Sequence, residues 1–331
     1  MYKWFVPLLK IIKYGSHIDN TGFPMGKGNG FGKVILFNEH FVVYGIPSIV
    51  SAIDLETTAV VTKQEKNGVI LDDQRPATKG YKEEKKKHQI DSLSRILKKM
   101  KKENQPLKIT LGGKLVAASG IGASAASCVA IARAINEEFH MQLTEEEINA
   151  IAFEGEKGYH GSPSGVDNTA ATYGGLIWFK KANPDVIKRL KIQAPLEIVM
   201  GNTGMVANTK LAVQNVRRSK EKHPHLYAQF FTQAEEVVEK ARDALRSQNL
   251  TQIGECMNEN HTLLQKIAVS NKNLDFLVQV ARETGAFGAK LTGGGLGGYM
   301  VALTPGKDLQ EKVARAITRE GFYTIKTRIG V

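Results

Sequence analysis

An aspartate and a lysine that lie far apart in the sequence are the side chains best suited to moving a proton. Asp167 lies in residues 160–168, a segment that leaves a helical run through glycine, turns at a proline and presents one carboxylate among small residues. A carboxylate that faces a substrate hydroxyl can act as a base if a nearby cation keeps it charged and steadies the alkoxide. Lys33, in the strand-like run 32–37, is the candidate cation. The alternative is that Asp167 forms an Asx turn or caps a helix.

A loop of small residues could hold a polyphosphate. Residues 117–126 have short side chains and lie between a strand and a long helical run. Glycine lets the backbone approach a ligand closely, and the first N–H groups of a helix carry the positive end of its dipole. The alternative is a tight turn that allows close helix packing. The expected phosphate contacts are Ala118, Ser119, Gly120, Ile121, Gly122, Ala123 and Ser124.

Two familiar nucleotide motifs are excluded. Gly32-Lys33 is followed by Val34, and Lys27 occupies the earlier glycine position, so the segment is not a P-loop. Residues 293–298 satisfy G-x-G-x-x-G, but a strand follows them where a dinucleotide site needs a helix. Such a dense glycine cluster still implies close backbone approach, either to another chain segment or to the phosphate loop.

These segments must be positioned by a mixture of strands and helices. Runs rich in Val, Ile and Thr predict strands at 33–37, 48–53, 57–62, 107–111, 175–180, 196–201, 298–303 and 322–328. Apolar residues at helical spacing predict helices at 123–139, 144–159, 230–245, 250–267 and 274–284, and a lysine-rich helix before the fourth strand. Thr144 and Glu147 fit a capping box. Because strands and helices are grouped rather than alternating, the sequence predicts an α+β fold.

Composition bounds the class of protein. The 331 residues are 42% hydrophobic and 24% charged, which excludes collagen-like, disordered and disulfide-scaffold proteins and suggests two lobes that share a cleft. Cys128 and Cys256 stand alone, so we expect a reducing, cytoplasmic setting. The net charge of +12 permits anionic partners. The lysine runs 85–87 and 98–102 lack interleaved aromatic residues and fit a solvated helix face, so we expect no nucleic-acid and no membrane partner.

The first residues stand apart from this pattern. Lys3, Pro7 and Lys10 interrupt an apolar stretch that is too short to span a bilayer and has no signal-peptide cleavage site. Translation could instead begin at Met25. We treat 1–24 as an N-terminal extension of uncertain status. We expect an N-terminal lobe at 25–190, with the phosphate loop and Asp167, and a C-terminal lobe at 191–331.

At these residues the chain resembles the GHMP small-molecule kinases. Residues 32–45 are similar to the first motif of the family, Ser119–Ala126 to its phosphate loop and 288–295 to its third motif, in the right order. Residues 160–168 resemble the H-G-x-P-S-G-x-D segment of the branch that phosphorylates mevalonate. Residues 72–76 and 168–175 resemble the short-chain, trypanosomatid-type members of that branch.

The resemblance implies a role for several residues. It makes Asp167 the catalytic base or charge stabiliser and Lys33 its cationic partner, with ATP and Mg²⁺ as cofactors and mevalonate as the small-molecule substrate. Ser124 and Glu156 would hold the magnesium, although Glu156 could instead be a solvated helix residue. Glu39 and His40 would line the mevalonate pocket, and unaided His40 fits a hydrogen-bonded core histidine. Thr203 and Thr292 would border the pocket, or could be strand-end hydroxyls that cap turns.

The implied fold is the two-lobed α+β GHMP arrangement, with an N-terminal lobe like ribosomal protein S5 and a ferredoxin-like, helical C-terminal lobe. Such kinases are often homodimers. Two residues depart from the family pattern: Asn38 replaces a glycine, and Ala123 replaces the first of two serines. Asparagine tolerates a left-handed backbone, and alanine keeps the loop small.

Rival functions remain open at this point. The same kinase could act on a sugar, on another hydroxyl of mevalonate or on a phosphorylated mevalonate. A ligand sensor on the same fold that has lost its chemistry is a further alternative, and the joint presence of Lys33, Ser124, Glu156 and Asp167 argues against it.

Overall fold

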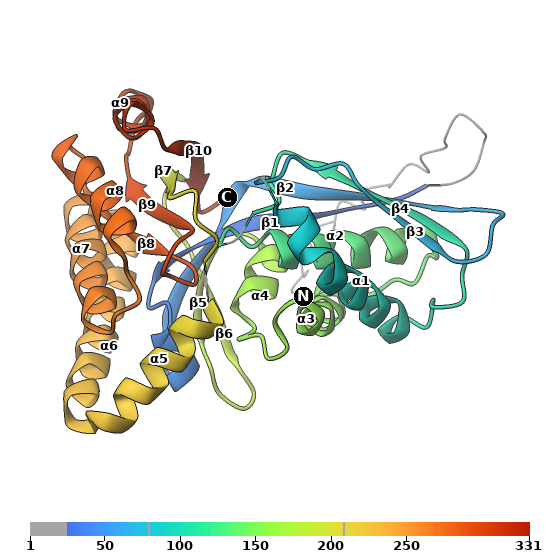
Figure 1. Cartoon of the computed structure of the whole chain (residues 1–331), viewed down its shortest axis with the longest axis horizontal. Coiled ribbons are helices and arrows are strands. Elements are labelled where there is room, and N and C mark those ends of the chain that lie inside the picture. Colours follow the sequence, from blue (N-terminus) through green and yellow to red (C-terminus); the bar gives the residue numbers. More distant parts are fainter. Residues whose placement is uncertain (1–24, 79, 119, 208) are drawn as a thin grey trace, which may run out of the picture.

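The chain folds into two lobes that share one sheet (Figure 1). The computed structural model describes residues 25–331, except residues 79, 119 and 208. The expectations for residues 1–24 therefore lie outside the described residues. Within the described part of the chain, none of the helices has the length and apolar character needed to cross a membrane.

The helices and strands follow one another in an order that separates two groups. The N-terminal group consists of β1 (Gly26–Phe37), the 3-10 helix η1 (Phe41–Tyr44), β2 (Ser48–Lys63), β3 (Val69–Asp73), α1 (Tyr81–Lys99), β4 (Leu107–Gly113), α2 (Ala123–Glu138), α3 (Glu145–His160), α4 (Val166–Tyr173), β5 (Leu176–Lys180) and β6 (Val186–Leu190). The C-terminal group consists of β7 (Leu196–Asn202), α5 (Thr209–Lys222), α6 (Pro224–Ser247), α7 (Leu250–Lys266), α8 (Lys272–Glu283), β8 (Gly288–Thr292), β9 (Tyr299–Leu303), α9 (Lys307–Arg319) and β10 (Tyr323–Ile329).

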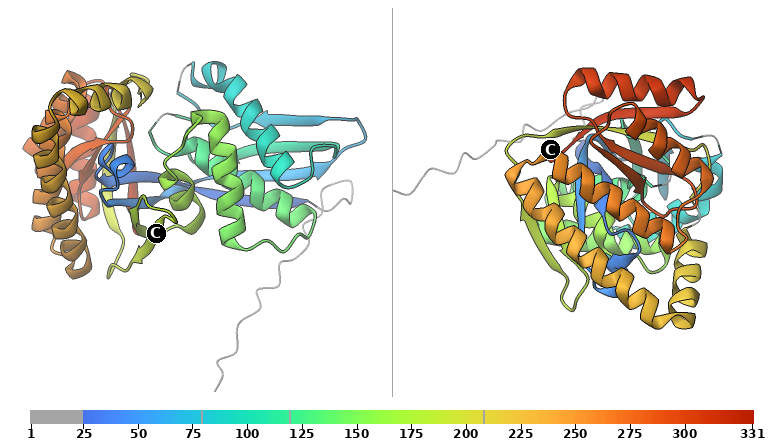
Figure 2. Two further views of the ribbon diagram at one scale, coloured as in Figure 1. Left: turned by 90° about the horizontal axis from the view of Figure 1, so that it is seen from below. Right: turned by 90° about the vertical axis from the view of Figure 1, so that its left-hand side faces the viewer.

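One mixed sheet runs through both lobes. Its strands follow the order β3-β4-β2-β10-β7-β9-β8, while β1 and β5 also pair with β2, and β6 pairs with β5. The two lobes join where Ile53 of β2 pairs with Ile329 of β10. Helices α1–α4 lie on one side of the N-terminal part of the sheet, and α6–α8 form the outer layer of the C-terminal lobe (Figures 1 and 2). The predicted α+β arrangement is confirmed, whereas the lobe boundary at residue 190 stays a proposal.

Helix α2 packs unusually close to β1. A Cβ added to Gly26, Gly28 or Gly30 would lie 2.1 to 2.3 Å from a backbone oxygen of α2. These alternate glycines share one face of the strand, because side chains alternate along β structure. The strand begins at Gly26 rather than at Lys33 as predicted. Because its glycines have no side chains, α2 can pack directly against the strand that carries Lys33.

The structure differs from the predicted elements in identifiable ways. The strands predicted at 48–53 and 57–62 are one strand, β2, whose middle residues Asp54–Glu56 are exposed or half-buried and so interrupt the apolar pattern. The predicted helices correspond to α1, α2, α3, α6, α7 and α8, and the capping box of α3 is present: Thr144 Oγ1 accepts from Glu147 N at 3.2 Å. The sequence analysis missed β3, β6, β8, α4, α5 and α9.

Candidate active site

Lys33 of β1 and Asp167 of α4 lie in direct contact. Lys33 Nζ lies 3.0 Å from Asp167 Oδ1. The lysine side chain is 3% exposed and the aspartate 29%, so the carboxylate is the open side of the pair. Asp167 lies in the first turn of α4, a helix that the sequence analysis did not predict, and Gly165, with φ 92°, is the N-cap of that helix. The positive end of that helix favours a charged carboxylate at this position.

The loop of small residues at 117–126 contacts Lys33 of this pair directly. Lys33 N donates to Ile121 O at 2.9 Å. Gly122 has φ 72°, and a Cβ added there would lie 2.6 Å from Lys33 Cγ, so no other residue fits without displacing the lysine. A Cβ on Gly293 would lie 3.1 Å from Gly120 Cα, so the third motif approaches the same loop from the C-terminal lobe. The glycine cluster at 293–298 therefore serves close approach between chain segments.

The start of α2 suits an anion. Gly122 is its N-cap, and among the described residues no side chain caps the helix and no acidic residue lies in its first turn. Ala118, Ile121, Ala123 and Ser124 are all buried, and Ser119 lies outside the described residues. A helix N-terminus with free N–H groups and positive dipole attracts phosphate oxygens.

Glu156 lies beside this helix end and is almost fully buried. Its side chain is 2% exposed, and Oε1 has no hydrogen-bond partner among the described residues. Burial, followed by the charge of Asp167, raises the pKa of Glu156 to about 8, and the Ser124 hydroxyl partly offsets the rise. His160 Nε2 lies 3.8 Å from Glu156 Oε2 and 3.4 Å from Ser124 Oγ. Glu156 is therefore not a solvated helix residue.

This arrangement fits a magnesium ion that is shared with a nucleotide. Mg²⁺ is commonly held by one or two carboxylates and substrate phosphates. A nearby cation stabilises a carboxylate that burial otherwise keeps protonated. Among the described residues no group of three or more His, Cys, Asp or Glu could hold a metal. A cation between Ser124 and Glu156 would therefore need oxygens from its substrate.

Glu39 forms a buried ion pair that the sequence analysis did not predict. Its partner is Lys290 of β8, and both side chains are 1% exposed or less. Burial raises the pKa of Glu39 and lowers the pKa of Lys290, although each attracts the other, and the charge of Lys33 acts on both groups. Glu39 Oε2 has no hydrogen-bond partner in the described part of the chain. A free buried acceptor of this kind can receive a hydrogen bond from a substrate hydroxyl. A lone lysine inside an apolar strand was the signal that could have revealed this pair.

Asn38 and His40 shape the turn that follows β1. Asn38 has φ 69°, which explains how asparagine replaces glycine there, and its amide donates to Pro47 O at 2.7 Å and Ala234 O at 2.9 Å. His40 Nε2 lies 3.0 Å from Gly294 O, and burial lowers the pKa of His40 to about 4. The ring is therefore neutral, donates through Nε2 and leaves Nδ1 as an acceptor.

The two predicted threonines do not turn their hydroxyls towards the Lys33–Asp167 pair. Thr292 Oγ1 accepts from Ile35 N at 3.1 Å and donates to Ile35 O at 3.0 Å, so it joins β8 to β1. Thr203 Oγ1 donates to Gly298 O at 2.9 Å and accepts from Met205 N at 3.3 Å. Both geometries match the alternative of a hydroxyl that holds a strand end.

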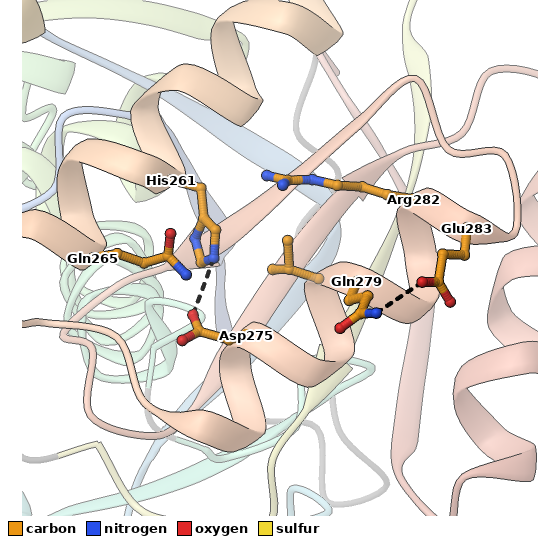
Figure 3. Close-up of a pocket in the computed structure, with 7 residues that line it drawn as sticks. His261, Gln265, Asp275, Gln279, Arg282 and Glu283 are labelled. Carbon is orange, nitrogen blue, oxygen red and sulfur yellow. Dashed lines mark hydrogen bonds and ion pairs between the residues drawn. The ribbon is translucent and has the colours of Figure 1, made fainter.

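A separate hollow lies in the C-terminal lobe. It has a volume of about 300 Å³, lies between α7 and α8 and is lined by His261, Gln265, Asp275, Val278, Gln279, Arg282 and Glu283 (Figure 3). Its acidic and basic groups are already largely paired with one another or with backbone: His261 Nε2 lies 3.2 Å from Asp275 Oδ1, and Arg282 donates to Ala289 O. None of the predicted site residues lines it, so we do not assign the chemistry to this hollow.

Comparisons with known proteins agree with this geometry. The GHMP kinases N terminal domain profile matches residues 91–175, and the GHMP kinases C terminal profile matches residues 241–324. The chain is 34% identical over 319 residues to the mevalonate kinase of Pyrococcus furiosus, covering 90% of this chain and 94% of that protein.

Solved structures give the same result. The chain is similar to the crystal structure of L. major mevalonate kinase in complex with R-mevalonate, with TM-score 0.88 and 40% identity over 92% of this chain and 95% of that one. The galactokinase of Lactococcus lactis, at 18% identity and TM-score 0.73, shares the fold alone.

Proposed function

The chain belongs to the GHMP kinase family, and from this premise we propose that it transfers the γ-phosphoryl group of ATP to the primary hydroxyl of mevalonate, giving 5-phosphomevalonate. The observation that carries the proposal is the contact of Lys33 with Asp167 at 3.0 Å, directly against the phosphate loop. The 40% identity to a kinase solved with R-mevalonate supports mevalonate as the acceptor.

The reaction needs an acceptor hydroxyl held in line with the γ-phosphate. Phosphoryl transfer has a loose transition state, so positioning and charge stabilisation dominate catalysis. The open carboxylate of Asp167 would accept a hydrogen bond from the hydroxyl and take its proton as the bond to phosphorus forms. Lys33 would keep Asp167 charged and stabilise the negative charge of the acceptor oxygen. The leaving ADP would carry the electrons of the broken P–O bond.

The nucleotide would bind with its phosphates at the start of α2. The backbone N–H groups of the first turn and the small side chains of Ala118, Ala123 and Ser124 leave room for the phosphate oxygens. Ser124 and Glu156 would hold Mg²⁺. When bound, the ion would neutralise charge on the β- and γ-phosphates.

The acceptor would be held from the opposite side by residues that follow β1. Glu39 offers the unpartnered Oε2, and neutral His40 offers Nδ1 as an acceptor. Lys290 keeps Glu39 in place through their buried ion pair. We do not expect direct substrate contacts from Thr203 and Thr292 through their hydroxyls, because these are occupied by backbone groups.

An acceptor panel tests this function. The purified protein, ATP and Mg²⁺ are combined with mevalonate, phosphomevalonate, galactose or homoserine, and ADP release is measured together with product identity by phosphorus NMR. We expect turnover with mevalonate and phosphorylation of its primary hydroxyl. Turnover with another acceptor but not with mevalonate would overturn the proposal, and absence of ADP release with every acceptor would favour a ligand sensor. An Asp167→Asn preparation made in parallel reports any contaminating kinase.

We also propose a cellular compartment and an oligomeric state: the protein is a cytoplasmic homodimer. Two buried free cysteines, Cys128 and Cys256, support a reducing compartment, and the resemblance to GHMP kinases supports the dimer. Light scattering of the purified chain would give a mass of one protomer if the dimer is wrong.

A further inference from the structure

One short segment holds both ends of the phosphate loop. The segment runs from Asp73, at the end of β3, to Thr78. At the start of the loop, Ala117 N donates to Pro76 O at 2.7 Å and Thr78 N donates to Ala117 O at 3.1 Å. These bonds form a parallel bridge between Ala77 and Ala117. The loop therefore begins at a fixed point on this segment.

Arg75 holds the other end of the loop. Its Nη1 donates to Ala123 O at 3.1 Å and to Ser127 Oγ at 2.6 Å, within the first two turns of α2. The side chain is 2% exposed. Ser127 Oγ also donates to Ala123 O at 2.7 Å, so three polar groups meet at the first residue of the helix. That residue precedes Ser124, the proposed magnesium ligand.

Asp73 fixes the arginine in turn. Arg75 Nε and Nη2 donate to the two carboxylate oxygens of Asp73 at 2.9 and 2.7 Å, the bidentate geometry that makes arginine specific. Helix α1 adds two contacts to Asp73: Gln89 Nε2 donates to its carboxylate at 2.9 Å, and Lys82 Nζ donates to its backbone oxygen at 2.6 Å. The guanidinium is thus held by β3 and α1 and directed at α2.

We propose that Arg75 is a positioning residue for nucleotide binding, which sets the first turn of α2 so that its N–H groups and Ser124 face the phosphates. The inference rests on the proposed function, because it assigns the phosphates to that helix end. Arg75 touches neither substrate in this account. It acts through Ala123 O, Ser127 and the backbone they belong to.

Arg75 should affect the binding of ATP but not the binding of mevalonate. The acceptor residues Glu39 and His40 lie after β1 and are held by Lys290 and Gly294. The hydrogen bonds of Arg75 go instead to Asp73, Thr57, Ala123 and Ser127. Loss of Arg75 should therefore weaken ATP binding and slow transfer while leaving mevalonate binding almost unchanged. A purely structural arginine would lower stability without this asymmetry.

The test compares the variants Arg75→Lys and Asp73→Asn/Arg75→Met with wild type. Lysine keeps the charge but lacks the planar fork that serves Asp73 and Ala123 together. The double variant removes both charges at once, which avoids a buried unpaired carboxylate that could prevent folding. We expect KM for ATP to rise about 10- to 100-fold in both, the range seen when the partners that orient metal ligands are lost. KM for mevalonate should stay almost unchanged.

Arg133→Lys is the matched control. Arg133 is a residue of α2 itself, pairs with Glu145 and donates to the backbone oxygens of Asn29 at 2.8 Å and Thr172 at 2.7 Å. It lies ten residues beyond Ala123, about 15 Å along the helix. Its loss should lower stability without changing KM for ATP. Hydrogen exchange should show faster exchange at residues 123–127 in the Arg75 variants and not in the control.

The outcomes distinguish this inference from the proposed function. An inactive wild-type protein in the acceptor panel would remove the function on which the inference rests. An active wild type with Arg75 variants whose KM for ATP is unchanged would overturn the inference and leave the function intact. Equal rises in the two KM values, or the same effect in Arg133→Lys, would show that Arg75 is merely structural.

Discussion

Replacing Glu156 by glutamine should stabilise the nucleotide-free protein, by an amount that grows with pH. Burial and the charge of Asp167 raise the pKa of Glu156 from 4.5 to about 8. Between these values the native state keeps a proton that the unfolded chain has released, so stability falls as pH rises through this window. Each pKa unit corresponds to about 1.4 kcal/mol. Above pH 8 the buried charge of Glu156 therefore lowers the free energy of unfolding by about 5 kcal/mol. Glu156→Gln removes this loss of stability.

Thermal unfolding without nucleotide or Mg²⁺ measures this effect. An unfolding entropy of about 2.1 cal/mol/K per residue converts 5 kcal/mol into a Tm difference of about 7 °C at about pH 8.5, and we expect almost none at about pH 5. Glu154→Gln is the control, because Glu154 is partly exposed on the same helix and its hydrogen bond from Lys157 lowers its pKa. That variant should lose stability slightly at alkaline pH. A Tm difference for Glu156→Gln that is the same at both pH values would refute the reasoning.

Three further predictions concern the loop, the acceptor side and the fold. Gly122→Ala places a Cβ 2.6 Å from Lys33 Cγ, so kcat in a steady-state assay should fall by about tenfold or more, and an unchanged kcat would contradict this steric argument. Lys290→Met leaves Glu39 buried without its partner and should lower the free energy of unfolding in urea by about 3–5 kcal/mol. The double variant with Glu39→Gln should regain most of that loss, and equal losses in the two proteins would count against the ion pair. Thr144→Ala removes the capping box of α3 and should cost about 1 kcal/mol in the same urea experiment without altering kcat; a change in kcat would show that α3 influences the site.

Local signals in the sequence predicted much of the fold. Apolar periodicity predicted α2, α7 and α8 to within about two residues of their observed bounds, because each buries one continuous stripe. It also predicted α6, but that helix begins at Pro224, six residues before the predicted start at 230. The capping box gave the start of α3. Short elements such as α4 and β6 were missed because a few residues carry too little periodicity. The exposed helix α5 was missed because polar residues dominate it and little of it is buried.

The candidate site was predictable only where a residue type carries its own chemistry. Asp167, Lys33 and the small-residue loop could be predicted from their residue types alone. In the structure Lys33 contacts both Asp167 and the loop. Lys290 contacts Glu39 and Arg75 contacts Ala123 O, and both partners lie far away in the sequence, so residue spacing does not predict these contacts. The lone lysine in an apolar strand was a signal for the first of them. The buried state of Glu156 also follows from tertiary packing, since its position on α3 fits a solvated face equally well.

The central claim is that the carboxylate of Asp167 serves the acceptor hydroxyl beside the phosphate loop. Turnover of purified Asp167→Asn with saturating mevalonate and ATP, measured together with its affinity for ATP, tests this most directly. The account predicts a fall in kcat of about two to four orders of magnitude with ATP affinity nearly intact. Turnover close to that of the wild type would contradict it.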